Sequence, residues 1–336
     1  MKGDCKRPIS LFTNFVRYDR IIGKETALTG GINVSGRNGN GCVLCPRMCA
    51  ADRMNGKRGF CGLTTDIMLA RAALHLWEEP CISGTRGSGT VFFSGCQLGC
   101  VFCQNYQISA EGFGAPVTEE RLAEIFLSLQ EMGAHNINLV SATPHTDAVL
   151  RVLDRMRGRE LTIPVVWNSG GYERVETLRR LDGYVDIYLP DYKYHDPARA
   201  EKYSGAADYP ETALAAIHEM VRQTGKYAIG EDGIMVRGTV IRHLVLPGGR
   251  HDSLACVDDI AQNFGTDDVL LSLMSQYTPF YRAEEFPEIN RRVTTFEYES
   301  VCRRVREYGF EGFFQEKSSA KEEYTPPFDL EGVFKT

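Results

Sequence analysis

The sequence predicts an α/β protein, a partial (β/α)6 barrel of TIM type with parallel strands and a cysteine-rich N-terminal extension. Two observations predict this fold. From Thr90 onward, short apolar runs alternate with segments of helical spacing, and strand, helix and strand in succession imply parallel pairing with right-handed crossovers. Polar residues also follow successive strands at the same place, as in barrels whose chemistry lies at the carboxyl ends of the strands.

The predicted strands begin at Thr90 and recur through the rest of the chain. Strands are expected at residues 90–93, 136–141, 163–167, 185–189, 237–246, 269–275 and 312–314. Helices are expected at residues 118–133, 147–156, 173–181, 210–223, 253–264 and 295–308. Thr118 is a typical N-cap residue, and Gly133 is a typical helix end. Residues 66–77 mix helical and strand spacing, so that they predict neither element.

The chain is expected to have three regions: an extension over residues 1–87, the barrel over 88–316 and a tail over 317–336. A doubly wound sheet is disfavoured because it would place a GxGxxG turn after the first strand, where the sequence has none. With 336 residues, the chain is long enough for one large domain or two.

Composition narrows the class of protein. Hydrophobic residues make up 43% and charged residues 24% of the chain, which is typical of a globular protein. The net charge of −6 gives no bulk positive field for nucleic acid. No apolar run approaches the roughly 18 residues of a membrane span, and the first 30 residues lack the apolar stretch of a signal peptide. A cytoplasmic protein is therefore expected, with no membrane partner and with nucleic acid an unfavoured one.

Three cysteines follow the first barrel strand at the spacing CxxxCxxC: Cys96, Cys100 and Cys103. In a reducing compartment such a group indicates metal ligands rather than disulfides. Soft thiolates select zinc, copper(I) or iron-sulfur clusters. A four-iron cluster normally takes four cysteines, so one iron would remain open to a small chelating ligand. A zinc site that borrows a remote fourth ligand is the alternative.

Four further cysteines lie in the extension. They are Cys42, Cys45, Cys49 and Cys61. Four thiolates make a closed site with no open coordination position, which favours a structural or electron-relaying metal. Zinc and an iron-sulfur cluster both accept this ligand set, and the spacing does not separate them.

The CxxxCxxC loop resembles that of the radical S-adenosylmethionine (SAM) superfamily. Three motifs make the resemblance narrower: Gln-Asn after the third cysteine, Pro-Asp-Tyr-Lys at residues 190–193 and Ile-Arg-His-Leu-Val-Leu-Pro-Gly-Gly at 241–249. Together they are similar to the pyruvate formate-lyase activating enzymes. The Cys-Val-Leu-Cys-Pro-Arg-Met-Cys run at 42–49 and the Phe-Phe-Ser-Gly-Cys run at 92–96 point to the PflX-like branch of that family.

This resemblance implies both cofactors and residue roles. Cys96, Cys100 and Cys103 would hold a 4Fe-4S cluster whose open iron is chelated by SAM. The residues implied in SAM binding are Phe102, Asn105, Ser141, Thr143, Asn168, Ser169, Gly170, Asp191, Lys193, Arg242 and Gln276. Lys193 and Gln276 would face the SAM carboxylate, because a carboxylate requires a cation or a donor. No catalytic side chain beyond the cluster ligands is implied.

One motif of the family is altered. The usual Gly-Gly-Glu after the second strand, which receives the SAM amino group, is replaced by Ser141-Ala142-Thr143-Pro144-His145. The amino group would then be bound by backbone carbonyls, by the hydroxyl of Ser141 or Thr143, or by another group. The substrate side of the pocket is not mapped by the resemblance.

The resemblance implies an enzyme that cleaves SAM reductively and uses a 5′-deoxyadenosyl radical to abstract hydrogen. The electron donor would be a protein such as flavodoxin or ferredoxin. The substrate would be a protein partner, as in glycyl-radical activation, or a small molecule or RNA. A non-catalytic iron-sulfur or zinc protein that binds or carries electrons is the alternative from another class.

Overall fold

The computed structural model describes residues 41–315 and 326–335, which belong to one unit of the chain, Val34–Thr336. Residues 1–40 of the predicted extension and 317–325 of the predicted tail lie outside the described residues.

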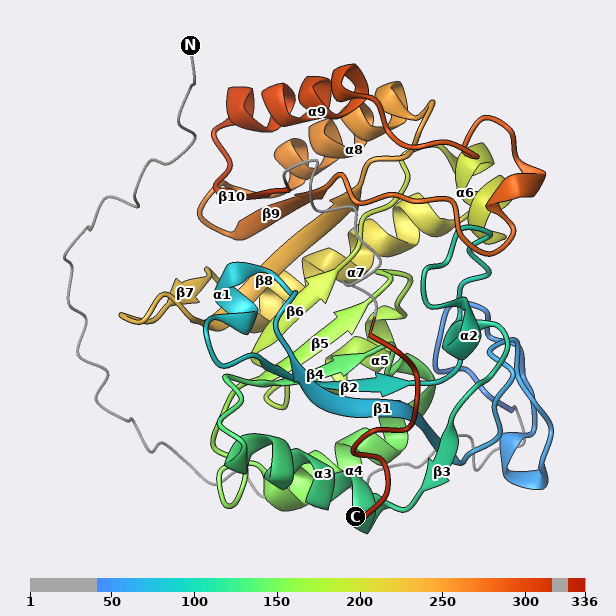
Figure 1. Ribbon diagram of the computed structural model, residues 1–336, viewed down its shortest axis with the longest axis vertical. Helices are drawn as coiled ribbons and strands as arrows, with labels where there is room; N and C mark the ends of the chain where they lie inside the picture. The colour runs from blue at the N-terminus through green and yellow to red at the C-terminus, as the bar shows by residue number, and fades with distance from the viewer. Residues whose placement is uncertain (1–40, 316–325, 336) are drawn as a thin grey trace. The chain divides into compact units, whose positions relative to one another are not determined.

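The framework of the described residues is a sheet of ten strands (Figure 1). The strands are β1 (Ile67–His75), β2 (Ser88–Phe93), β3 (Ala115–Val117), β4 (Ile137–Val140), β5 (Val165–Ser169), β6 (Ile187–Pro190), β7 (Ala228–Ile229), β8 (Met235–Leu244), β9 (Val269–Met274) and β10 (Gly312–Phe314). Their order is β10-β9-β8-β6-β5-β4-β2-β1-β3, with β7 paired to β8. The sheet brings the predicted barrel strands side by side in sequence order.

Pairing from β2 through β4, β5, β6, β8 and β9 to β10 is parallel. The predicted α/β fold with parallel strands is therefore confirmed. The edge beyond β2 differs from the prediction, because β1 and β3 add to it in antiparallel pairing. The last part of the predicted extension thus continues the sheet.

Helices lie on the connections between strands. They are α1 (Pro80–Ser83), α2 (Tyr106–Ser109), α3 (Glu119–Glu131), α4 (Thr146–Met156), α5 (Val175–Arg179), α6 (Pro197–Ser204), α7 (Tyr209–Thr224), α8 (Arg250–Asn263) and α9 (Thr295–Tyr308). One-turn 3-10 helices cover Arg53–Asn55, Thr143–His145 and Ala283–Glu285. Thr118 caps α3 as expected, with Oγ1 accepting from the Arg121 amide at 3.1 Å.

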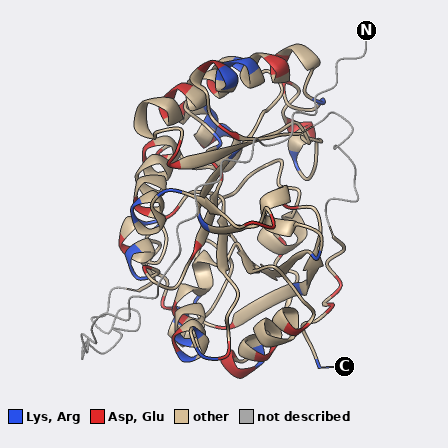
Figure 2. Ribbon diagram, turned by 90° about the vertical axis from the view of Figure 1, so that its left-hand side faces the viewer, with Lys and Arg blue, Asp and Glu red and all other residues tan. Residues whose placement is uncertain are grey.

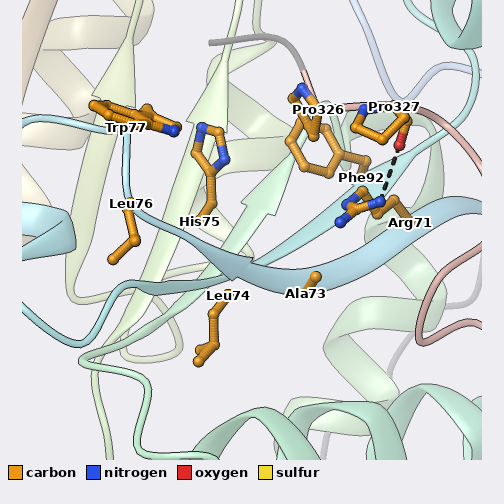
Figure 3. A pocket seen from close by; sticks show the side chains of 9 residues that line it. All are labelled: Arg71, Ala73, Leu74, His75, Leu76, Trp77, Phe92, Pro326 and Pro327. Carbon is orange, nitrogen blue, oxygen red and sulfur yellow. Dashed lines mark hydrogen bonds between the residues drawn. The ribbon is translucent and has the colours of Figure 1, made fainter. Parts of the chain in front are cut away.

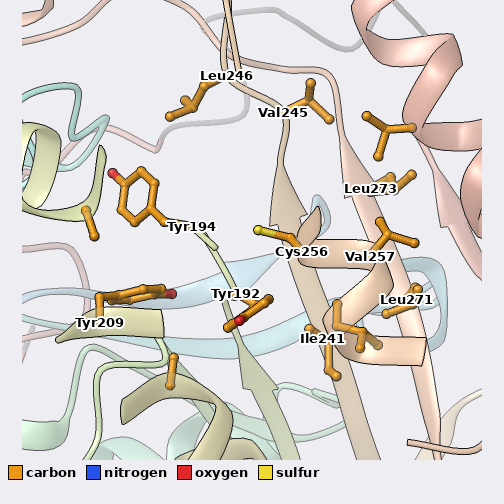
Figure 4. Close-up of a cluster of buried hydrophobic side chains, with 14 of the residues drawn as sticks. Tyr192, Tyr194, Tyr209, Ile241, Val245, Leu246, Cys256, Val257, Leu271 and Leu273 are labelled. Carbon is orange, nitrogen blue, oxygen red and sulfur yellow. The ribbon is translucent and has the colours of Figure 1, made fainter. Parts of the chain in front are cut away.

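Alternation along each strand separates two faces of the sheet. Val91 and Phe93 pack in the cluster that contains the apolar side chains of α3 and α4, whereas Phe92 belongs to a different cluster with Val140. A second helix-covered cluster joins β8 and β9 to α8, where Ile241 packs with Val257 and Leu271 among other residues (Figure 4). Helices therefore cover the outer face of the barrel, and a strand's alternate residues point inward.

The inner face is partly filled by α1. Cys81 and Ile82 of this short helix pack against inward-pointing residues of β5, β6, β8 and β9, among them Val166, Leu189 and Val240. Burial of these side chains holds α1 inside the barrel (Figure 1). The residues just before α1 are consequently drawn in between the strands.

Residues 326–335 lie along β1. The Ala72 amide donates to the Glu331 carbonyl at 2.8 Å, and the Leu330 amide donates to the Ala70 carbonyl at 3.0 Å. Arg71 forms an ion pair with Asp329 at 2.7 Å. We call residues 326–335 the C-terminal strap, because they cover backbone groups of β1 that the sheet leaves open.

Basic and acidic residues are interspersed along the outer helices (Figure 2). Among residues 41–315 and 326–335, no helix combines the length and the apolar character that crossing a bilayer would require.

Candidate active site

The three-cysteine loop follows β2 and precedes α2. Its backbone is fixed to the end of α6, where the Gly99 amide donates to the Ser204 carbonyl at 3.1 Å. Each sulfur also has a polar neighbour. The contacts are Leu98 N to Cys96 Sγ at 3.4 Å, Ser204 Oγ to Cys100 Sγ at 3.0 Å and Ser109 Oγ to Cys103 Sγ at 3.2 Å. Donors at these positions suit sulfurs that carry negative charge.

The three thiols influence one another electrostatically. Burial raises the pKa of each of them, and the neighbouring Cys100 also raises the pKa of Cys96 and Cys103; the resulting pKa of Cys103 is about 11. A metal displaces such thiol protons when it binds. Within the described part of the chain, no three His, Cys, Asp or Glu side chains converge as a single ion would require. A four-iron cluster instead spreads its cysteine ligands over the cluster, and the three neighbouring sulfurs fit that group.

A chain of charged groups lies near the same loop. Lys193 Nζ is 2.5 Å from Asp191 Oδ2, and Arg242 Nε is 3.0 Å from Asp191 Oδ1. Arg242 Nη2 also donates to Asn168 Oδ1 at 2.5 Å. Burial alone would raise the pKa of Asp191, but Lys193 and Arg242 outweigh it and hold this pKa below its usual value. Asp191 and Lys193, which follow β6, thus meet Asn168 of β5 and Arg242 of β8, and their role in SAM binding stays a prediction.

The turn after β5 brings backbone close to the cysteine loop. A Cβ atom on Gly170 would lie 2.9 Å from a methyl carbon of Leu98, and one on Gly171 would lie 2.0 Å from the Asp191 carbonyl oxygen. Gly171 also has a φ of +76°, which favours glycine. Tyr209 donates its hydroxyl to the Gly170 carbonyl at 2.9 Å. The Ser169–Gly171 turn therefore lies between Asp191 and the cysteine loop.

The altered motif after β4 has its own geometry. Ser141 adopts a φ of +59°, an uncommon conformation for a residue other than glycine, and its amide donates to the Asn168 carbonyl at 2.9 Å. The Thr143 hydroxyl donates to Glu173 Oε1 at 2.6 Å and accepts from Gln97 Nε2 at 3.2 Å. The hydroxyl proton of Thr143 is thus already used inside the protein.

Phe102, Asn105 and Gln276 lie on the loops after β2 and β9. The Phe102 ring packs edge to face with Tyr277, with ring centroids 5.7 Å apart. Asn105 precedes α2 and accepts from the Ile108 amide at 3.1 Å. Gln276 accepts from Gln315 Nε2 at 2.9 Å. The structure places these three residues on loops at strand ends, without showing their predicted role.

Sequence reasoning missed the acidic residues Glu78 and Glu79. They precede α1 and lie inside the barrel beside Arg242, whose Nη1 is 3.4 Å from Glu78 Oε2. Sequence reasoning also missed Glu173, which is 1% exposed. Burial raises the pKa of Glu173 to about 7, although hydrogen bonds from Thr143 and Gln97 lower it. The sequence signal for the first two was a pair of adjacent glutamates before a proline. This pattern is also that of an ordinary solvated helix start, so it did not indicate a buried site.

The four N-terminal cysteines lie in one folded segment. A Cβ atom on Gly59 would be 3.2 Å from Cys49 Sγ and 3.6 Å from Cys61 Sγ. The neighbouring thiols of Cys42 and Cys61 contribute to raising the pKa of Cys45 to about 12, although burial is the larger cause. Proximity and mutual charge effects connect the four cysteines within this segment, although no three His, Cys, Asp or Glu side chains of the described residues converge as a single ion would require. A metal there stays a prediction.

Buried polar contacts join this segment to the barrel. Arg53, which is 8% exposed, donates from Nη1 to the Pro144 carbonyl at 2.8 Å and lies 3.8 Å from Cys42 Sγ. Thr177 donates its hydroxyl to the Leu44 carbonyl at 2.7 Å. The cysteine segment is therefore held against the carboxyl ends of the strands.

A separate pocket of about 220 Å³ lies between β1 and the strap (Figure 3). Its aromatic wall includes His75, Trp77 and Phe92, and Arg71 reaches from it to the Pro327 carbonyl at 3.1 Å. Burial, assisted by the charge of Arg71, lowers the pKa of His75 to about 4. The His75 imidazole is therefore neutral at pH 7.

The sequence matches the Radical SAM superfamily over residues 90–248. It is also 30% identical over 314 residues to an uncharacterized protein of Methanocaldococcus jannaschii. The alignment covers 89% of this chain and 84% of that relative. Among solved structures, SuiB of Streptococcus suis bound to the precursor peptide SuiA matches with a TM-score of 0.47 and 13% identity, over 66% of this chain and 46% of SuiB.

A domain of pyruvate-formate lyase-activating enzyme from Bacteroides vulgatus ATCC 8482 matches with a TM-score of 0.37 and 12% identity, over 51% of this chain and 92% of that domain. The chain thus spans about half the length of SuiB and most of the length of its methanogen relative.

Together with the cysteine loop at the end of β2, the family match over residues 90–248 defines the class: the protein is a radical SAM enzyme. The chain belongs to the radical SAM superfamily, which implies a 4Fe-4S cluster and SAM as its cofactors.

Proposed function

We propose that Cys96, Cys100 and Cys103 hold the 4Fe-4S cluster and that the Asp191–Lys193–Arg242 group binds SAM beside it. The proximity of the two groups supports this assignment. Lys193 lowers the pKa of the Cys100 thiol, although burial raises it more strongly, and Lys193 is held by Asp191 at 2.5 Å. A cation fixed next to a thiolate loop is suited to a ligand that carries a carboxylate.

With both cofactors bound, the chemistry supplied is reductive cleavage of SAM to a 5′-deoxyadenosyl radical that abstracts hydrogen from the substrate. The side chains of this chain orient the reactants. Asp191 fixes the Lys193 ammonium and the Arg242 guanidinium, so that neither must reorganise when a carboxylate binds. The absence of a side chain at Gly170 lets the turn pack against Leu98 of the cysteine loop.

We further propose that the substrate is a protein partner, as in glycyl-radical activation, with a flavodoxin or ferredoxin as the electron donor. Support comes from the motifs at residues 190–193 and 241–249. In the structure Asp191 and Arg242 pair across β6 and β8. A small molecule is the second candidate substrate. The net charge of −6 disfavours RNA.

For the N-terminal site we propose a bound metal, zinc or an iron-sulfur cluster, at Cys42, Cys45, Cys49 and Cys61. The segment supplies four thiols within mutual electrostatic reach. Arg53 lies 3.8 Å from Cys42 Sγ and offsets thiolate charge.

Anaerobic reconstitution with iron and sulfide, followed by dithionite and SAM, tests the proposed reaction. We expect 5′-deoxyadenosine from the wild-type protein and none from Cys100→Ala, with Cys100→Ala retaining the far-UV circular dichroism of the wild type. If the reconstituted wild-type protein forms no 5′-deoxyadenosine, the proposed function is wrong. Iron, sulfide and zinc content of the protein with and without the four N-terminal cysteines identifies the second metal.

A further inference from the structure

Two adjacent carboxyl groups, those of Glu78 and Glu79, lie inside the barrel. Both precede α1, and the apolar packing of Cys81 and Ile82 against the strands draws this segment inward. The Glu78 side chain is 11% exposed, and Glu79 as a whole is 8% exposed. Carboxyl groups are rarely buried to this extent unless they have partners.

Glu78 has partners on three strands. Its Oε1 accepts from Asn138 Nδ2 of β4 at 2.9 Å and from Asn168 Nδ2 of β5 at 3.3 Å. Its Oε2 has a longer contact, 3.4 Å, with Arg242 Nη1 of β8. One carboxylate oxygen is thus held by two amides, whereas the other has only a stretched contact and keeps acceptor capacity.

Two further acceptors at this place have no donor. Glu79 Oε2 and Asn138 Oδ1 are buried, and no residue that the structure describes donates a hydrogen bond to either atom. Asn138 is fully buried, and its amide is fixed at the cluster by its bond to Glu78. Buried acceptors without a donor are costly. Both unpaired atoms here are acceptors, so this place lacks hydrogen-bond donors.

The charges of the neighbouring groups point to the same deficit. Lys193 and Arg242 both make their short contacts with Asp191, at 2.5 and 3.0 Å. Among charged groups, Glu78 and Glu79 therefore share only the remaining capacity of Arg242, while a hydrogen bond from the neutral Ser272 side chain lowers the pKa of Glu79. Burial raises the pKa of both glutamates, and Arg242 opposes this only in part. A carboxyl pair beside a cation that is already paired can accommodate an additional cation.

We propose that Glu78, Glu79 and Asn138 form a binding site inside the barrel for an organic cation, an ammonium or guanidinium group. We call these three residues the inner floor. Such a group brings several N–H donors and a positive charge, which are the two things that the site lacks. A metal ion is the less suitable occupant, because no three acidic, cysteine or histidine side chains among the described residues converge on one point.

The cation has two candidate sources. One is the amino group of SAM, whose usual acceptor motif is replaced at Ser141–His145. The other is an amine or guanidine on the substrate, such as a lysine or arginine side chain of a protein partner. The second source rests on the proposed function, whereas cation binding itself is independent of SAM cleavage.

Isothermal titration of the full-length protein without reductant tests the site. The probes are n-butylammonium, n-butylguanidinium and uncharged n-butanol of matched length. We expect the two cations to bind the wild-type protein and butanol to bind at least about tenfold more weakly, a difference of about 1.4 kcal/mol. If the cations bind wild-type protein no better than butanol, the proposed site is wrong.

Variants and SAM analogues then locate the site and its source. Glu78→Gln keeps the shape and is expected to lose the preference for the cations, whereas Glu231→Gln, at an exposed residue, is expected to keep it. Unchanged preference in a folded Glu78→Gln protein would contradict the assignment.

S-adenosylhomocysteine and its analogue without the amino group separate the sources. If the wild-type protein binds S-adenosylhomocysteine more tightly than the analogue without the amino group, and Glu78→Gln abolishes this difference, the site belongs to the cofactor. Binding of butylammonium together with S-adenosylhomocysteine assigns it to the substrate. If the reconstituted wild-type protein forms no 5′-deoxyadenosine but still prefers the cations, the proposed function is wrong and the cation site stands.

Discussion

Arg47 Nε donates to the carbonyl of Gln97 at 2.9 Å, which links the N-terminal cysteine segment to the residue next to Cys96. The same guanidinium donates from Nη1 to the Gly205 carbonyl at 2.5 Å, and its carbon lies 4.1 Å from the centroid of the Phe60 ring. Arg47 lies between Cys45 and Cys49 in sequence and also lowers the pKa of the Cys100 thiol, in which burial has the largest effect. One side chain therefore contacts both cysteine groups.

Arg47→Ala should loosen the three-cysteine loop, because it removes charge-assisted hydrogen bonds to the carbonyls of Gln97, Ser204 and Gly205. We expect a loss of about 1.5–3 kcal/mol in the free energy of unfolding and a changed electron paramagnetic resonance spectrum of the reduced cluster. Lys57→Ala, at an exposed residue of the same segment, is the control and should change neither. A wild-type spectrum from Arg47→Ala would show that the two cysteine groups are not coupled through this residue.

Lys193→Met is expected to weaken SAM binding by roughly tenfold or more, because a charge-assisted contact to the carboxylate is lost. Equilibrium dialysis of the reconstituted protein measures it. Lys202→Met is a suitable comparison, since the Lys202 side chain is 50% exposed and pairs with Glu288. Equal affinities in the two variants would remove Lys193 from the SAM site.

The two glycines Gly171 and Gly183 offer a matched pair. Both have a positive φ, +76° and +81°, but a Cβ atom would be 2.0 Å from the Asp191 carbonyl oxygen at Gly171 and has no neighbour within 4 Å at Gly183. Gly183→Ala should cost about 1 kcal/mol of unfolding free energy. Gly171→Ala should cost at least about 3 kcal/mol. Urea denaturation of both variants measures the difference, and equal costs would contradict the close approach.

Glu173 predicts a pH dependence of stability. Burial raises its pKa to about 7, although hydrogen bonds lower it. In the unfolded chain the Glu173 carboxyl has its ordinary pKa of 4.5. Between these two pH values the folded protein therefore retains a proton that the unfolded chain has released. The stabilisation by this proton is complete below about pH 4.5 and is lost as the pH rises through about 7. The lost stability is on the order of 3 kcal/mol.

Glu173→Gln removes this titration. The measurement is the difference in unfolding free energy between wild type and Glu173→Gln at several pH values. Burial lowers the pKa of His145 to about 4, so His145 contributes to stability with the opposite pH dependence. Because both proteins contain His145, the difference cancels its contribution. The wild type should lose stability relative to Glu173→Gln between pH 4.5 and 7. A constant difference would mean that Glu173 is ionised in the folded protein.

The parallel barrel and its strand-end residues were predictable because they depend on local patterns. Short apolar runs such as the one in β5 and the helical spacing in α3 are visible within short windows. Asp191 and Lys193 are close in sequence, and Arg242 follows a strand in the same way, so their meeting follows from parallel order.

The inner floor was not predictable, because its residues are brought together by non-local packing. Glu78 and Glu79 directly precede Pro80, a pattern typical of an exposed helix start. Only the packing of α1 against four strands turns Glu78 inward. The sequence of β1 mixes two spacings, and its neighbours are distant in sequence: residues 69–75 pair with β2, whereas β3 and the strap share the other edge. The predicted role of Thr143 likewise depended on Glu173, thirty residues away.

The strap also has a consequence for biosynthesis. Ala72 receives its hydrogen-bonding partner from residue 331, so an emerging polypeptide presents the outer edge of β1 uncovered while the whole barrel is being translated. Exposed strand edges recruit other strands. Stalled or C-terminally shortened chains should therefore aggregate more readily than the finished protein, and a fusion tag placed directly after residue 325 would have the same effect.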